Sequence, residues 1–356
     1  MLVQLAPPWR VAAGPVALRG SARARKAVRI RLHDAEGQSG VGEALPLPGY
    51  SRDDVETAER LLAALLGVVL EVPDSTTGAA CLAATLAPLE ALLAPSPSAR
   101  FALECALLDL LARRAGQSAA AWLAEGRALQ PVPVSVLLPD DAAAAVAAAR
   151  AAARRGHTVL KLKVARADRS VAQEQALLAA VRAAADGAAP GAVRLRLDAN
   201  GAMDPATLVQ RLSAWAAFGV ELVEEPLAGS ALLHMPSLPL PWAADESLDD
   251  PARAAALLAM PSGRGPAGLV LKPALLGLVR CFELAHASAA RGLGVIVTHS
   301  LDGDLGHAAA RALALALPLA PWPCGLAAHP GLHRPVDPGV WLAAPVGLGL
   351  AIDSGD

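Results

Sequence analysis

Lysine is scarce in this sequence, and its placement is informative. Of thirty-one basic residues only four are lysines, and three of these, Lys161, Lys163 and Lys272, lie in short apolar runs. Arginine supplies positive charge elsewhere in the chain. Where a basic residue must release and recover a proton, lysine is needed in place of arginine, because arginine is not deprotonated in proteins. The pair Lys161 and Lys163 is therefore the predicted centre of a catalytic site.

Carboxylates stand at the ends of the next apolar runs along the chain. Asp198 precedes a turn signal, the pair Glu224 and Glu225 precedes Pro226, and Asp245 ends the following run. If these runs are parallel strands of a barrel, their carboxyl ends meet at one mouth and the carboxylates form an oxygen-rich cage. Such a cage suits Mg²⁺, with Mn²⁺ as a substitute, and it needs no histidine or cysteine, which disfavours zinc.

These residue types favour one kind of chemistry. A lysine that faces a second lysine near a divalent cation is expected to have a lowered pKa, so that it acts as a base near neutral pH. A cation bound to a substrate carboxylate would stabilise the enolate that forms when the adjacent proton is removed. The predicted reaction is therefore abstraction of a proton beside the carboxylate of a small-molecule substrate.

Each of these residues alone has an ordinary explanation. A lone Asp or Glu at a strand end is more often a helix cap or an ion-pair partner, and a lone lysine there usually extends to solvent. Five successive strand ends that carry Lys, Asp, Glu, Asp and Lys in a lysine-poor chain are not expected from such roles. The series as a whole therefore favours a catalytic site.

The elements that must position these side chains repeat from Pro131 onward, where short β-rich runs alternate with alanine-rich helical stretches. Side chains alternate along a strand, so Lys161 and Lys163 share one face and the aliphatic residues share the other. Repeated βα units imply a parallel sheet, most economically closed as a (β/α)₈ barrel; an open doubly wound sheet is disfavoured because no glycine-rich phosphate loop follows any strand. The predicted strands are residues 132–138, 158–164, 193–198, 220–225, 242–245, 269–272 and 295–299, with an eighth around 326–332.

A smaller α+β module precedes the predicted barrel. Alternation over residues 27–32 predicts antiparallel strands, the Pro- and Gly-rich residues 40–51 predict a long loop, and residues 53–66 and 99–115 predict amphipathic helices. The predicted domains are an α+β capping domain (1–125), a (β/α) barrel (126–320) and a C-terminal segment (321–356) that ends the barrel and returns to complete the capping domain.

Composition restricts the partners of this protein. The net charge of −2 gives no electrostatic argument for nucleic acid or an anionic membrane. No stretch of the sequence resembles a signal peptide or a membrane span, and the four scattered cysteines form no metal or redox pair. We expect a cytoplasmic protein that binds a small carboxylate, and the sequence leaves a homo-oligomer open.

As a set, five motifs resemble the enolase superfamily. They are Lys161-Leu162-Lys163, Leu197-Asp198-Ala199-Asn200-Gly201, Val223-Glu224-Glu225-Pro226, Ala244-Asp245-Glu246-Ser247 and Leu271-Lys272-Pro273. The resemblance implies a modified barrel with a capping domain, and Mg²⁺ held by Asp198, Glu224 and Asp245. It implies Glu224 rather than Glu225 because relatives often carry glutamine at the second position.

The two-lysine arrangement resembles the muconate-lactonizing subgroup of that superfamily. There it implies Lys163 as the base, Lys161 as a group that helps hold the substrate carboxylate, and Lys272 as a cation that stabilises the enolate. His299 on the seventh strand lacks the aspartate partner that a histidine base has in the mandelate-racemase subgroup, because the sixth strand carries Lys272 instead. His299 is therefore predicted to line the pocket or to be structural.

The loop Gly42–Ser51 is similar to the capping-domain loop of o-succinylbenzoate synthases, the dehydratases of menaquinone biosynthesis, and the run Leu269–Gly277 is typical of them. This implies loss of water from a cyclohexadiene carboxylate that bears a succinyl group, with Lys163 returning its proton to the departing hydroxide. The chain has Asp302 where relatives often carry glutamate. The predicted substrate contacts are Tyr50, Ser51, Asn200, His299 and Ser300.

Other functions fit the same residues. Racemisation or epimerisation of N-acylamino acids or dipeptides, or cycloisomerisation, would use Lys163 and Lys272 on opposite faces of the substrate. A non-catalytic barrel that serves as a binding protein is a third hypothesis, and it would be favoured if Lys163→Ala left every activity unchanged.

Overall fold

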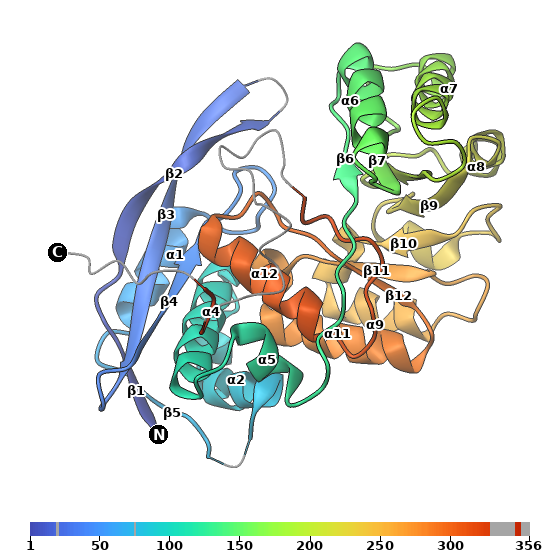
Figure 1. The fold of residues 1–356 in the computed structure, drawn as a ribbon. Helices are drawn as coiled ribbons and strands as arrows, with labels where there is room; N and C mark the ends of the chain where they lie inside the picture. The colour runs from blue at the N-terminus through green and yellow to red at the C-terminus, as the bar shows by residue number, and fades with distance from the viewer. Residues whose placement is uncertain (19–20, 75, 328–345, 350–356) are drawn as a thin grey trace.

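The computed structural model describes residues 1–18, 21–74, 76–327 and 346–349, and it confirms the predicted fold class (Figure 1). The N-terminal part contains an antiparallel sheet in which β2, β3, β1 and β5 lie in that order and β4 pairs with β3. The bounds are β1 (Leu2–Leu5), β2 (Trp9–Leu18), β3 (Ser21–Asp34), β4 (Ser39–Ala44) and β5 (Val69–Glu71). Val28, Ile30 and Leu32 alternate along β3 and are fully buried, as the period of two predicts.

The helices of this part include α4, which packs against β4. Gly40 and Gly42 permit this approach, because an added Cβ would lie 2.2 Å and 1.9 Å from the carbonyl oxygens of Ala106 and Ala102. The prediction of a loop from residue 40 onward is wrong at its start, since β4 needs these glycines for close packing rather than for turns. The helices are α1 (Val55–Ala64), α2 (Gly78–Leu86), η1 (Ala87–Leu89), α3 (Glu90–Leu93), α4 (Pro97–Arg114) and α5 (Ala119–Ala124).

The second part is a curled parallel sheet that runs from green to orange in Figure 1, in the order β6 to β12 without interruption. All seven predicted strands are present: β6 (Val136–Leu137), β7 (Val159–Lys163), β8 (Arg194–Asp198), β9 (Val220–Glu224), β10 (Trp242–Ala244), β11 (Gly268–Leu271) and β12 (Gly294–Val297). The connecting helices are α6 (Ala142–Arg154), α7 (Val171–Asp186), α8 (Leu208–Ala216), η2 (Gly229–His234), η3 (Glu246–Asp249), α9 (Pro251–Ala259), α10 (Pro273–Leu276), α11 (Leu278–Ala290) and α12 (Asp304–Ala316).

The two edges of the curled sheet are joined by the chain around Cys324 and Gly325. Cys324 forms a parallel bridge with Val134 next to β6, and Gly325 forms one with Thr298 next to β12. The predicted position of the eighth strand, 326–332, is therefore a few residues too late, and residues 328–332 lie outside the described part of the chain. No alternating pattern marks this segment, because it is held by single bridges rather than by a regular ladder.

The interior of the barrel below the mouth is filled by apolar side chains. Leu222, Ala243, Val270 and Ile296 come from four successive strands and pack together, with Trp322 against them. This packed layer closes the barrel below, as expected for a barrel core rather than a pore. The site must therefore open at the other end.

The C-terminal segment touches the capping part where it is described. Gly347 forms a parallel bridge with Ser118, and Asp109 of α4 accepts a hydrogen bond from the Leu348 amide at 2.8 Å. These contacts agree with a tail that returns to the capping domain, whereas the exact domain boundaries stay a prediction. None of the helices in the described ranges is long and apolar enough to cross a membrane.

Candidate active site

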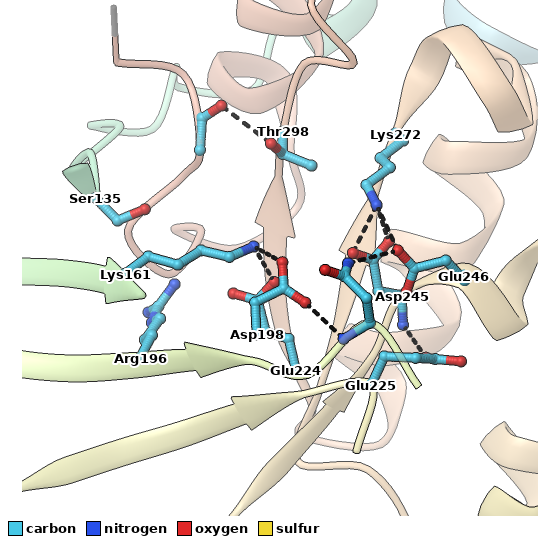
Figure 2. A network of polar contacts seen from close by, with 12 residues as sticks. Ser135, Lys161, Arg196, Asp198, Glu224, Glu225, Asp245, Glu246, Lys272 and Thr298 are labelled. Carbon is cyan, nitrogen blue, oxygen red and sulfur yellow. Dashed lines mark hydrogen bonds and ion pairs between the residues drawn. The ribbon is translucent and has the colours of Figure 1, made fainter. Parts of the chain in front are cut away.

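The lysines of β7 occupy the positions that strand alternation predicts. In the parallel pairing of β7 with β8, Lys163 lies beside Asp198, and Asp198 lies beside Glu224 of β9. Lys161 is two residues earlier on the same face of β7 and points into the barrel toward these acids (Figure 2). Because the strands end at the same level, their terminal side chains converge at the mouth.

Asp198, Glu224 and Asp245 form a buried acidic cluster at this mouth. Their ligand oxygens lie within 4.8 Å of one another, and none of the three residues is more than 4% exposed. Burial raises the pKa of Glu224 and of Asp245, because a charged carboxylate loses its hydration there. For Asp198, burial acts in the same direction, but Lys161 and Lys272 outweigh it and lower the pKa.

This cluster fits a divalent cation. Three carboxylates that approach one another in a buried site repel unless positive charge lies among them. A donor set of carboxylate oxygens alone, without histidine or cysteine, is the set that Mg²⁺ prefers. The arrangement therefore has both the charge and the donor chemistry for Mg²⁺, with Mn²⁺ as a substitute.

Lys161 lies against one side of the acidic cluster. Its Nζ lies 2.9 Å from Asp198 Oδ2 and donates a hydrogen bond of 2.6 Å to Glu224 Oε2. Burial by itself would lower the pKa of Lys161, but Asp198, Glu224 and Asp245 outweigh it and raise the pKa. The sequence predicted that a neighbouring positive charge lowers the pKa of one lysine, but at Lys161 the carboxylates have the larger effect. Lys161 is therefore suited to hold an anion rather than to remove a proton.

Glu225 is turned away from the cluster that its neighbour Glu224 joins. Its Oε2 accepts a hydrogen bond of 2.7 Å from the Asp245 amide, and its Oε1 accepts one of 3.0 Å from the Ser247 amide. Burial raises the pKa of Glu225 to about 7, against these hydrogen bonds. Glu225 thus shapes the backbone that carries Asp245, and this geometry agrees with the choice of Glu224 as the candidate ligand.

Lys272 lies on the opposite side of the cluster from Lys161 (Figure 2). Its Nζ lies 2.5 Å from Asp245 Oδ1 and 2.6 Å from Asp245 Oδ2, and it also contacts the hydroxyl of Tyr50 and Glu246 Oε1. The ammonium lies 5.0 Å from the centre of the Tyr50 ring, within the range of a cation–π contact. Burial would lower the pKa of Lys272, but Asp245 leads the groups that raise it well above its usual value.

The predicted substrate contacts fall into two groups in space. Tyr50 and Asn200 meet at the mouth, where both donate to Glu246 Oε1. Ser51 and Ser300 instead line a cavity of about 10 Å³, together with Glu43 and Asp302. The cavity lies between the segment after β12 and the loop that joins β4 to α1, residues 45–54, called the capping loop below. A space of this size holds about one water molecule, so the structure places Ser51 and Ser300 around this small space and not in the contacts of Tyr50 and Asn200 with Glu246.

His299 is held within its own turn. Its Nδ1 accepts a hydrogen bond of 3.0 Å from the Leu301 amide, and its ring lies 5.3 Å from the ring of His307. The role of His299, as a pocket-lining or a structural residue, stays a prediction. His307 itself is buried, which lowers its pKa to about 4 and keeps the imidazole neutral.

Sequence reasoning missed Glu246, which contacts three residues of the candidate site. Glu246 stands in the motif that contains Asp245, but nothing in its spacing distinguishes it from an ordinary glutamate at the start of a helix. It also missed Arg52, whose Nε lies 2.5 Å from Asp249 Oδ2. The contacts of Tyr50 with Glu246 and of Arg52 with Asp249 join the capping loop to η3. These two segments are about 200 residues apart in the chain, so no local sequence pattern predicts that they meet.

Two family models match this chain, one for each part of the fold. Residues 2–124 match the mandelate racemase/muconate lactonizing enzyme N-terminal domain, and residues 143–355 match the enolase C-terminal domain-like family. The chain therefore belongs to the enolase superfamily, as the five motifs predicted.

Relatives with two different activities within that superfamily are similar to this chain. An o-succinylbenzoate synthase from Desulfotalea psychrophila is 34% identical over 60% of this chain, a match that spans 57% of that protein's length, less than two thirds. Another from Thermosynechococcus vestitus is 30% identical over 85% of this chain and 86% of its own. The L-Ala-D/L-Glu epimerase of Escherichia coli is 28% identical over 98% of this chain and 96% of its own.

Solved structures share the fold. A dipeptide epimerase from Enterococcus faecalis superposes with a TM-score of 0.77 at 22% identity, covering 93% of this chain and 92% of its own. A muconate cycloisomerase from Pseudomonas fluorescens gives 0.77 at 23% identity, covering 98% and 96%. At these identities the likeness describes the fold and leaves the reaction open.

Proposed function

We propose that this protein is an Mg²⁺-dependent dehydratase of the o-succinylbenzoate synthase type, acting in menaquinone biosynthesis. The observation that carries the proposal is the asymmetry of the two lysines across the mouth. Among the described residues the Lys163 side chain is exposed and makes no ion pair or hydrogen bond, whereas Lys272 contacts Asp245, Glu246 and Tyr50. One lysine that is free to move and one that is held suit a reaction with a single base.

The chain's own residues would divide the work as follows. Asp198, Glu224 and Asp245 would hold Mg²⁺, which supplies positive charge for the oxygens of the substrate carboxylate as the enolate develops. Lys161, already between Asp198 and Glu224, would hold a carboxylate oxygen. Lys272 would remain a cation on the other side of the ring.

Lys163 would perform both proton transfers. It would take the proton on the carbon beside the carboxylate, leaving the electron pair of that C–H bond to form the enolate. The electron pair would then form the ring double bond as the C–O bond breaks, and Lys163 would return the proton to the departing hydroxide to give water. Because the same amine serves both steps, the hydrogen and the hydroxyl must leave from the same face.

The relatives support the same proposal. The o-succinylbenzoate synthases of Desulfotalea psychrophila and Thermosynechococcus vestitus are 34% and 30% identical to this chain over the matched regions. The direct test is turnover of the succinyl-bearing cyclohexadiene carboxylate by the purified protein with Mg²⁺, followed by the absorbance of the aromatic product. Absence of turnover by a folded, Mg²⁺-binding protein would reject this function.

An epimerase or racemase is the second candidate, and one observation favours it. The Escherichia coli epimerase matches almost the whole chain, and Lys163 and Lys272 stand at the ends of strands on different sides of the acidic cluster. Two such lysines could act on opposite faces of an N-acylamino acid or a dipeptide; a cycloisomerase would use the same placement. Incorporation of solvent deuterium at the α-carbon of those substrates, together with inversion, would support this candidate over the dehydratase.

A further inference from the structure

Glu246 is the first residue of η3 and a point where three elements of the mouth meet. Its Oε1 accepts hydrogen bonds from Asn200 Nδ2 at 3.1 Å and from the Tyr50 hydroxyl at 3.2 Å, and it lies 3.5 Å from Lys272 Nζ. These donors come from the end of β8, from the capping loop and from the end of β11. One carboxylate oxygen therefore joins the capping loop to two strand ends of the barrel (Figure 2 shows Glu246 beside Lys272 and Asp245).

The contact between Glu246 and Lys272 gains importance under the proposed function, on which this inference rests. Lys272 Nζ now lies within 2.6 Å of both oxygens of Asp245. If Asp245 binds Mg²⁺, its lone pairs are shared with the metal ion, and its attraction for the Lys272 ammonium is reduced. Glu246 is then the remaining carboxylate within 4.0 Å of Lys272 among the described residues.

We propose that Glu246 is a positioning residue that couples the seating of the capping loop to the placement of Lys272. Tyr50 is the link, because its hydroxyl contacts both Glu246 Oε1 and Lys272 Nζ. When the loop sits on the barrel, Tyr50 and Glu246 together hold the ammonium over the site. When the loop lifts, Lys272 loses one of these partners and gains freedom to move.

The capping loop has a second tie to η3 that does not reach Lys272. Arg52 Nε lies 2.5 Å from Asp249 Oδ2, and Arg52 Nη2 donates to the Asp249 carbonyl at 2.8 Å. The two carboxylates lie at opposite ends of the same four-residue helix, and each side chain is about one third exposed. Asp249 is therefore a matched control: its substitution loosens the same loop without touching the ammonium.

Glu246→Gln is the informative substitution because it keeps the size of the side chain. The amide oxygen can take the place of Oε1, which is the atom that faces Tyr50, Asn200 and Lys272, so the substitution removes the negative charge beside the Lys272 ammonium rather than the acceptor. Tyr50→Phe removes the linking hydroxyl and retains the ring. Asp249→Asn makes the same chemical change as Glu246→Gln at the control position.

The first measurement needs no substrate, because the chain has only four lysines and each can be followed separately. The Mg²⁺-loaded variants are treated with limiting acetic anhydride, and acetylation of Lys272 is compared with that of exposed Lys26 by mass spectrometry. A lost hydrogen bond to a charged group corresponds to about a tenfold change. We expect Glu246→Gln and Tyr50→Phe each to raise the Lys272 to Lys26 ratio about tenfold, and Asp249→Asn to change it less than about twofold. Equal ratios for Glu246→Gln and Asp249→Asn would overturn the proposal.

The second measurement is steady-state turnover of the cyclohexadiene carboxylate. Glu246→Gln should lower kcat about tenfold with little change in KM, whereas Asp249→Asn should raise KM and leave kcat unchanged. Tyr50→Phe should have a smaller effect in the Glu246→Gln background than in the wild type, because Tyr50, Glu246 and Lys272 contact one another and form one network. A higher KM with an unchanged kcat in Glu246→Gln, or independent effects of the two substitutions, would reject the coupling. If the wild type does not turn over this substrate, the proposed function fails, and the acetylation ratios still decide the role of Glu246.

Discussion

The stability of this protein is expected to depend on pH through Asp302, a carboxyl group at the contact between barrel and capping part. The residue is 6% exposed, and its Oδ2 accepts one hydrogen bond, of 3.3 Å, from the Ser300 amide. Burial raises the pKa of Asp302 from its ordinary 3.8 to about 7; Arg25 opposes the rise and Glu43 adds to it. The folded protein therefore retains a proton that the unfolded chain has released.

The sign and size of the effect follow from linkage. A raised folded-state pKa contributes stability that is fully present below pH 3.8 and is lost as the pH rises to about 7. Each pKa unit corresponds to about 1.4 kcal/mol, so the interval from pH 5 to pH 7 accounts for a loss of about 3 kcal/mol. Asp302→Asn keeps an acceptor for the Ser300 amide and has no proton to lose, so it removes this dependence.

Urea unfolding of the wild type and Asp302→Asn at pH 5 and pH 8 measures the difference directly. We expect the free energy of unfolding of the variant, relative to the wild type, to rise by about 3 kcal/mol between the two pH values. Glu283→Gln, which removes an exposed partner of Arg280, is the control and should show a nearly constant difference. A wild-type to Asp302→Asn difference that is the same at both pH values would refute the reasoning.

Three further predictions concern the site and the packing that supports it. Lys163→Ala should lower turnover by a factor of about 10² to 10⁴ while the exposed position leaves the melting temperature nearly unchanged; retained turnover would remove Lys163 from the mechanism. Glu224→Gln should weaken Mg²⁺ binding at least about tenfold by calorimetry, because one charged oxygen donor is lost; unchanged affinity would mean that another residue is the ligand. Gly42→Ala should destabilise the protein by about 3 kcal/mol in urea unfolding, since the added Cβ would lie 1.9 Å from the Ala102 carbonyl oxygen; a smaller loss than that of an exposed Gly37→Ala control would contradict the close-packing argument.

Much of the barrel mouth was predictable because it depends on rules that act within a strand. The period of two along β7 places Lys161 and Lys163 on one face, and the turn after Asp198 marks the end of β8. Parallel strands then bring such ends together whatever the details of the helices between them. The acidic cluster of Asp198, Glu224 and Asp245 follows from these rules.

Other features depend on distances that local patterns do not carry. Ser51 follows Tyr50 in the chain, yet Ser51 lines the small cavity with Ser300 whereas the Tyr50 hydroxyl donates to Glu246. The position of Cys324 and Gly325 depends on the curvature of the seven-stranded sheet. The curved sheet leaves a space between its first and last strands, and the segment around Cys324 and Gly325 fills this space with single β-bridges.

The sequence by itself determined the residue types of the candidate site, the strand ends that carry them and the barrel that brings those ends together. The resemblance already favoured Glu224 over Glu225, but only the tertiary structure shows which atoms each side chain contacts. Glu224 and Glu225 are adjacent in the chain, yet one faces the acidic cluster and the other accepts the amides of Asp245 and Ser247. Likewise Lys163 is exposed while Lys272 is held by Asp245, Glu246 and Tyr50. The physical reason is that hydrogen-bond partners are chosen by positions in space, and these partners come from segments far apart in the chain.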